Sequence, residues 1–182
     1  MWLIATTLLG GVLLVHHLVA LPTPSAADHA LRDALRVELP SATWRAVHVM
    51  YRSCGCSRRT IDHLLGSHRP ADIHELVLMV DDAGRPDPRD RALVDAGFDV
   101  DVITPDALHA RFDLEAAPVL VVMSPDGELA YVGGYNRHKQ SAAYEDISII
   151  EELRQHRTAT ALPVFGCATS ARLQRAVDPL GL

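Results

Sequence analysis

The chain has 182 residues, of which 48% are hydrophobic and 22% are charged. This length suits one domain with short extensions, and the apolar content is enough for a packed core. The formal net charge is −6 and the sequence has no basic stripe, which argues against a nucleic-acid-binding protein that neutralises phosphates. Three cysteines are too few for a disulfide-framework mini-protein, or for an all-cysteine zinc or iron–sulfur site with four ligands from one chain.

The first 21 residues form an apolar segment without Asp, Glu, Lys or Arg. A membrane-spanning helix needs about 20 apolar residues, and this run barely reaches that length. A cleaved signal peptide would have a basic start, which is missing here, although Ser25-Ala26-Ala27 is a suitable cleavage site. We expect residues 1–21 to be a signal-anchor or transmembrane helix, with a cleaved signal peptide as the alternative. Either reading places the remainder outside the cytoplasm, on the periplasmic face or as an exported soluble form, where disulfides persist.

Beyond a short Pro-containing linker, hydrophobic periodicity and chain breakers predict helices that alternate with strands. The predicted helices cover residues 26–37, 57–66, 88–96, 105–112, 144–156 and 170–177. The predicted strands cover residues 44–51, 75–80, 98–103, 119–123 and 128–132. A Ser-Pro-Asp-Gly turn at 124–127 predicts a hairpin between the last two strands. The order is that of an α/β domain whose sheet becomes antiparallel at its end.

Two cysteines lie between the first strand of this domain and the helix that follows it. Cys54 and Cys56 flank a glycine, and Arg52, Arg58 and Arg59 add positive charge nearby. A thiol at a helix N-terminus faces unpaired N–H groups and the positive end of the helix dipole, which favour the thiolate that attacks disulfides. A structural bridge between positions two apart would close almost no loop and would stabilise little. We therefore interpret the pair as redox-active.

Four motifs together resemble the thioredoxin-like superfamily: Val47-His48-Val49-Met50-Tyr51-Arg52-Ser53-Cys54-Gly55-Cys56, Ala117-Pro118 before a strand, Ser124-Pro125-Asp126-Gly127, and Tyr131-Val132-Gly133-Gly134. Within this superfamily, the sequence most resembles membrane-tethered bacterial members. The resemblance covers residues 43–156, with a signal-anchor at 1–21, a linker and helix at 22–42 and a C-terminal tail at 157–182. It implies a central mixed sheet flanked by helices and a cis-proline, matched by Pro118, beside the cysteines. Ala117 and Pro118 would then shape a groove for an extended peptide.

The cysteine spacing departs from the Cys-x-x-Cys of thioredoxins, and two alignments are possible. If Cys54 matches the attacking cysteine, Ser57 falls at the resolving position and Cys56 is an extra thiol. If Cys56 matches the resolving cysteine, the spacing is one residue short. We expect Cys54 to attack and Cys56 to resolve the mixed disulfide. In the first alignment His48 takes the place of a buried acid that relays protons, so it is either an auxiliary group or a packed histidine.

The resulting hypothesis is an extracytoplasmic thiol–disulfide oxidoreductase that acts on protein thiols and disulfides. No organic cofactor is implied, because no phosphate-cradling glycine loop is present. Cys167 is either a lone packed thiol or a third thiol that resolves the pair or binds metal with it. The alternative function is copper binding or delivery by Cys54, Cys56 and either His138 or Cys167, since soft thiolates favour Cu(I). A third is a redox-inactive binding module. The direction of electron flow stays open.

Overall fold

The computed structural model describes residues 20–22, 29–38, 43–83, 87–139 and 141–178, together with Trp2 and Thr6. The predicted signal-anchor at 1–21 therefore lies almost entirely outside the described residues. Within the described ranges, no helix combines the length and the apolar character that a membrane crossing requires.

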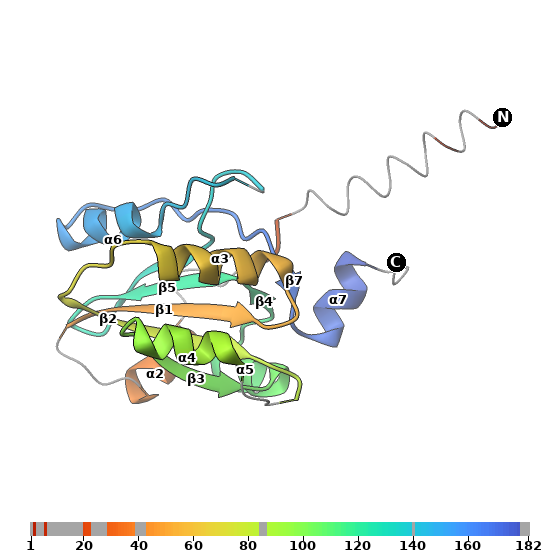
Figure 1. The fold of residues 1–182 in the computed structure, drawn as a ribbon, viewed down its shortest axis with the longest axis horizontal. Helices are drawn as coiled ribbons and strands as arrows, with labels where there is room; N and C mark the ends of the chain where they lie inside the picture. Colours follow the sequence, from red (N-terminus) through yellow and green to blue (C-terminus); the bar gives the residue numbers. More distant parts are fainter. Residues whose placement is uncertain are drawn as a thin grey trace.

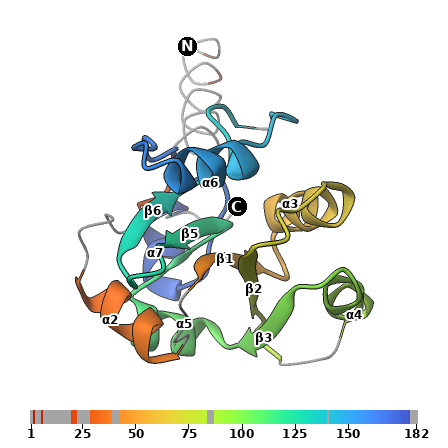
Figure 2. The same cartoon turned by 90° about the vertical axis from the view of Figure 1, so that its left-hand side faces the viewer.

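A five-stranded mixed sheet lies at the centre of the domain, in the order β3-β2-β1-β5-β6 (Figures 1 and 2). Its strands are β1 (Trp44–Tyr51), β2 (Ile73–Val80), β3 (Asp99–Ile103), β5 (Val119–Met123) and β6 (Leu129–Gly133). β2 runs parallel to both β1 and β3, whereas β5 runs antiparallel to both β1 and β6. The structure thus confirms the α/β class and the sheet that becomes antiparallel at its end.

Helices cover both faces of this sheet (Figure 2). The helices are α2 (His29–Glu38), α3 (Gly55–Gly66), α4 (Pro88–Asp95), α5 (Pro105–Phe112), α6 (Asp146–Arg154) and α7 (Ala171–Val177). Alternate residues of β1 point to opposite faces, so Val47 and Val49 join one core while Ala46 and Met50 join the other. The first core includes apolar residues of α2, α5 and α7, and the second includes those of α3, α4 and α6. Burial on both faces explains why the central strands are almost continuously apolar.

The predicted hairpin between β5 and β6 is confirmed. The Gly127 amide donates to the Ser124 carbonyl at 2.9 Å, and Gly127 has a φ of 78°, which an L-residue adopts only with strain. Short-range signals also fix the starts of two helices, each of which has a proline in its first turn and a side-chain N-cap. Asp87 forms a capping box ahead of α4, and Thr104 accepts from the Ala107 amide ahead of α5.

The segment predicted as a C-terminal tail packs back onto the domain. Leu162 and Val164 are buried, and the two-residue strand β7 (Cys167–Ala168) pairs antiparallel with β4 (Ala116–Ala117). A strand of two residues has no periodicity, so the sequence gives no signal for it. This pairing brings the C-terminal segment to the carboxyl end of β1, where the cysteines lie (Figure 1).

Candidate functional site

The turn that follows β1 places Cys54 at the N-cap of α3. Its amide donates to the Tyr51 carbonyl at 2.9 Å, and its own carbonyl accepts from the Arg58 amide at 3.1 Å. Ser57 is fully buried, and its hydroxyl oxygen accepts from the Tyr51 amide at 3.0 Å. Cys54 therefore stands at the helix start with Ser57 three positions later inside the fold, as in the first of the two alignments. Cys56 is the extra thiol.

A cis peptide bond joins Ala117 to Pro118 directly before β5. The Cys54 sulfur lies 3.9 Å from the Ala117 carbonyl oxygen. The predicted cis-proline beside the cysteine is therefore confirmed. Two segments separated by 63 positions in the sequence meet at one place.

Cys54 forms a disulfide with Cys167, not with Cys56. The two Cα atoms are 5.9 Å apart, and Cys56 is free and half-buried. The β4–β7 pairing sets Cys167 opposite Ala117, which brings its sulfur within bonding distance of Cys54. The expected Cys54–Cys56 pairing is thus not the one found, and Cys167 is not a lone packed thiol. Cys54 is fully buried in this oxidised state.

Cys56 instead lines a small pocket of about 40 Å³ beside the disulfide. The walls of this pocket are Arg59, Thr60, Pro118, Tyr135, Asn136, His138, Ser141, Tyr144, Pro163 and Phe165. The Arg59 guanidinium donates a hydrogen bond to the Cys56 sulfur at 3.4 Å. The free thiol, the cis-proline and the C-terminal segment therefore share one accessible surface.

The copper alternative receives no support from this geometry. Cys54 and Cys167 are joined to each other, so neither offers a thiolate to a metal. His138 does share the pocket of Cys56. Among the described residues, however, no three His, Cys, Asp or Glu side chains are grouped so that they would hold a metal ion.

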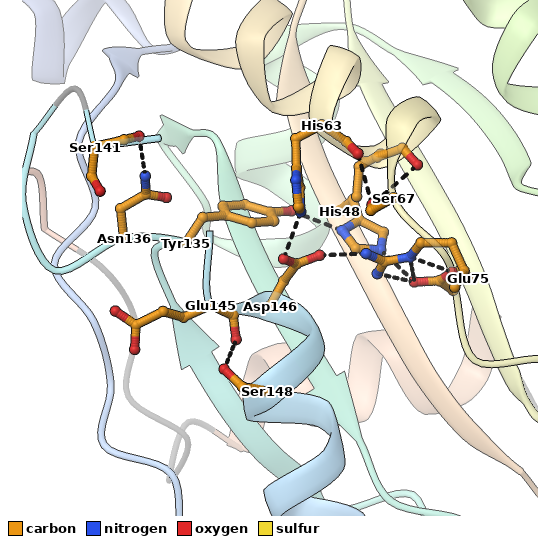
Figure 3. A network of polar contacts seen from close by, with 12 residues as sticks. His48, His63, Ser67, Glu75, Tyr135, Asn136, Ser141, Glu145, Asp146 and Ser148 are labelled. Atoms are coloured by element: carbon orange, nitrogen blue, oxygen red, sulfur yellow. Dashed lines mark hydrogen bonds and ion pairs between the residues drawn. The ribbon is translucent and has the colours of Figure 1, made fainter. Parts of the chain in front are cut away.

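A buried chain of polar side chains runs through the core behind the site (Figure 3). His48 is fully buried; its Nδ1 lies 2.8 Å from the Tyr135 hydroxyl and its Nε2 lies 3.1 Å from Glu75. An ionised carboxylate only accepts, so Nε2 carries the hydrogen of the contact with Glu75. In the neutral imidazole, Nδ1 then accepts from the Tyr135 hydroxyl. Arg69 donates to Glu75 at 3.0 Å and to Asp146 at 2.6 Å. His48 thus reaches the pocket of Cys56 through Tyr135, which lines it.

The acids of this chain remain ionised despite their burial. Burial alone would raise the pKa of Glu75, but hydrogen bonds from His48 and Arg69 outweigh it and lower that pKa. Burial likewise opposes ionisation of Asp146, yet the hydrogen bond from His63 and the charge of Arg69 hold its pKa well below the ordinary range. The charges are therefore compensated within the core.

Sequence reasoning identified His48 but not its partners. Glu75 gave a signal, since it is an acid at the start of a run of apolar strand residues. Arg69 and Asp146 come from segments 77 positions apart, and only the folded chain brings them together.

No protein-family model and no curated protein matches the sequence. Among solved structures, a hypothetical protein from Sinorhizobium meliloti 1021 aligns at a TM-score of 0.59 and 16% identity, over 85% of this chain and 99% of that one. An uncharacterized conserved protein from Geobacillus kaustophilus aligns at 0.54 and 12%, over 85% and 92% of the two chains. The thioredoxin domain of a thiol-disulfide oxidoreductase from Bacteroides vulgatus also matches, at 0.43 and 11%, over 76% and 95%.

At these identities the likeness concerns the fold. The fold itself is defined by the sheet order, by Cys54 at the start of α3 and by cis-Pro118 before β5. These are the features that the sequence resemblance implied. The chain has a thioredoxin-like fold.

Proposed function

We propose that the chain is a thiol–disulfide oxidoreductase that exchanges disulfides with protein substrates through Cys54 and Cys167. One observation carries the proposal: the Cys54–Cys167 disulfide lies at the N-terminus of α3, beside the cis Ala117–Pro118 peptide bond. The helix N-terminus favours the thiolate form of Cys54 when that bond is reduced. A thiolate next to a second cysteine is the arrangement that disulfide exchange requires.

In the reduced protein, the Cys54 thiolate attacks one sulfur of a substrate disulfide. A mixed disulfide forms, and the other substrate sulfur leaves as a thiolate. The Cys167 thiolate then attacks the Cys54 sulfur, which restores the Cys54–Cys167 bond and releases the second substrate thiolate. The substrate gains two electrons and the protein loses two; run backward, the same steps oxidise a substrate dithiol. In this scheme Cys167, and not Cys56 as we expected from the sequence, resolves the mixed disulfide, because Cys167 is the residue that is bonded to Cys54.

Trapping of the mixed disulfide tests these roles. With insulin as the substrate, we expect reduced Cys167→Ser to accumulate a covalent adduct on Cys54, because the second attack is lost. Cys54→Ser should form no adduct and should reduce insulin no faster than background. Cys56→Ser is the matched control, and it should turn over without accumulating an adduct. Mass spectrometry of alkylated, non-reduced digests identifies the linked cysteines.

The other outcomes of this experiment are equally informative. Accumulation of the adduct in Cys56→Ser, with normal turnover in Cys167→Ser, would transfer the resolving step to Cys56. If the wild-type protein reduces no insulin and no variant forms an adduct, the proposal fails and a redox-inactive binding module takes its place.

We further propose an extracytoplasmic location, with residues 1–21 as a membrane anchor. The absence of charge from this apolar segment and the presence of a disulfide support the proposal. In a bacterial host that exports the full chain, we expect the protein in the membrane fraction with residues 1–21 intact by mass spectrometry. A soluble periplasmic product that begins near residue 28 would identify a cleaved signal peptide. A cytoplasmic product of full length would contradict both readings.

A further inference from the structure

We propose that residues 163–169, here called the cover segment, occupy the peptide groove of this protein in the place that a substrate strand would take. The inference rests on the proposed function, since it takes the groove beside Cys54 as the place where substrate is bound. It also names a substrate class: an extended peptide strand with glycine directly before its reactive cysteine. Reduction of the Cys54–Cys167 bond would then free this groove for such a strand.

The first argument is the backbone pairing. Ala116 pairs with Ala168 and Ala117 pairs with Cys167 in an antiparallel register. The Thr169 amide extends this ladder by donating to the Glu115 carbonyl at 2.7 Å. Addition of a strand to a free sheet edge is a general mode of peptide binding. Here the backbone of β4, which directly precedes Pro118, is already paired with β7 of the same chain (Figure 1).

The second argument is covalent. The Cys54–Cys167 bond has the same chemical form as a mixed disulfide between Cys54 and the cysteine of a bound peptide. Cys54 has 0% exposure while this bond is present. An external disulfide therefore reaches Cys54 only after the bond has been reduced and the cover segment has moved away.

The third argument is the close approach of glycines. A Cβ on Gly166 would lie 1.9 Å from the Ala117 carbonyl oxygen and 2.7 Å from Pro118 Cδ. On the groove side, a Cβ on Gly134 would lie 2.0 Å from the Pro163 carbonyl oxygen. Any side chain at either position would push the two backbones apart. The groove thus selects glycine directly before the cysteine of the strand that it holds.

The cover segment is fastened at both ends. Before it, the Leu162 amide donates to the Tyr131 hydroxyl at 3.1 Å, and the Leu162 carbonyl accepts from Gly134 at 2.9 Å. After it, the Ser170 hydroxyl donates to Glu115 at 2.5 Å, and Arg172 forms an ion pair with the same carboxylate. A segment held at both ends has a high effective concentration at the groove, so it competes strongly with a free peptide.

The test uses a fluorescent peptide with the sequence of residues 163–170 in which serine replaces the cysteine, and the full-length protein. We expect Gly166→Ala, after reduction, to bind this peptide about tenfold or more tightly than the oxidised wild type, because its own cover segment no longer fits. Bound peptide should slow the alkylation of Cys54. Gly66→Ala is the matched control, since a Cβ there meets nothing within 4 Å. A second peptide with alanine in place of its glycine should not bind.

The inference is overturned if Gly166→Ala does not bind the peptide, if binding leaves the alkylation of Cys54 unchanged, or if both peptides bind alike. If Gly166→Ala does not fold, reduced and oxidised wild type are compared: binding to the reduced form alone supports the inference, and equal or absent binding overturns it. The peptide has no sulfur, so its binding is independent of disulfide exchange. Peptide binding without insulin reduction rejects only the proposed function, and adduct formation without peptide binding rejects only the cover segment.

Discussion

Reduction of the Cys54–Cys167 disulfide is expected to lower the free energy of unfolding by about 4 kcal/mol. The bond joins positions 113 residues apart, so it removes much of the freedom of the unfolded chain. In the chain-entropy description, a loop of roughly 100 residues corresponds to about 4.7 kcal/mol, and native disulfides commonly give about 2–5 kcal/mol. The bond also fastens the C-terminal segment to the domain, so we expect the same region to exchange its amide hydrogens faster after reduction.

Urea unfolding measures this effect on the oxidised protein and on the double variant Cys54→Ser with Cys167→Ser. Cys56→Ser is the matched control, because Cys56 is a free thiol outside the bond. We expect this control to change the free energy of unfolding by less than about 0.5 kcal/mol. Equal urea midpoints for the oxidised protein and the double variant would contradict the prediction.

The same free energy bears on the direction of electron flow. Because the bond stabilises the fold, the fold stabilises the bond by an equal amount, through a thermodynamic cycle. About 4 kcal/mol corresponds to roughly 90 mV at 30 mV per 1.4 kcal/mol, so the couple should be that much more reducing than in the unfolded chain. A reduced protein with such a couple gives electrons to substrates whose disulfides have a higher reduction potential. We therefore expect it to reduce disulfides better than it forms them, and a potential at or above that of the unfolded chain would contradict this.

Local signals predicted the elements that frame the site. The bounds of β1, α5 and β5 agree with the sequence prediction. β1 is rich in β-branched and aromatic residues without a chain breaker, and prolines mark the starts of α5 and β5. The place of Pro118 beside Cys54 also followed from the sequence, through its resemblance to a known family. These features depend on short stretches of chain, or on a motif whose two parts have fixed places in the fold.

The partner of Cys54 could not be predicted in this way. Disulfide connectivity depends on which segments meet in space, and the sequence has no signal for the two-residue pairing that brings Cys167 to Ala117. The buried polar chain is a similar case. Glu75 and Asp146 both accept hydrogen bonds from Arg69, which lies outside the strand and the helix that hold these two acids. No rule of sequence spacing connects the three residues.

Replacement of Asp146 by alanine is expected to lower the free energy of unfolding by about 3–5 kcal/mol. The Asp146 side chain has 0% exposure and accepts from His63 at 2.8 Å and from Arg69 at 2.6 Å. Loss of this carboxylate leaves the guanidinium of Arg69, which is only 11% exposed, with one acid fewer to compensate its charge. Asp72→Ala is the matched control: Asp72 also pairs with an arginine, Arg154, but it is 64% exposed. Because exposed pairs contribute little, we expect this control to cost less than about 1 kcal/mol.

The pH dependence of stability provides the sharper test of the same site. The pKa of Asp146 is lowered in the folded protein, and so is that of Glu75, because hydrogen bonds and the charge of Arg69 outweigh their burial. Unfolded acids therefore bind more protons than folded ones at acidic pH, so their stabilisation is complete above the unfolded pKa values, about 4, and is lost as pH falls below them. Between pH 6 and pH 3, the free energy of unfolding of Asp146→Ala should fall less steeply than that of the wild type. Asp72→Ala should keep the wild-type slope, and an equal slope in Asp146→Ala would show that Asp146 is not held ionised by its partners.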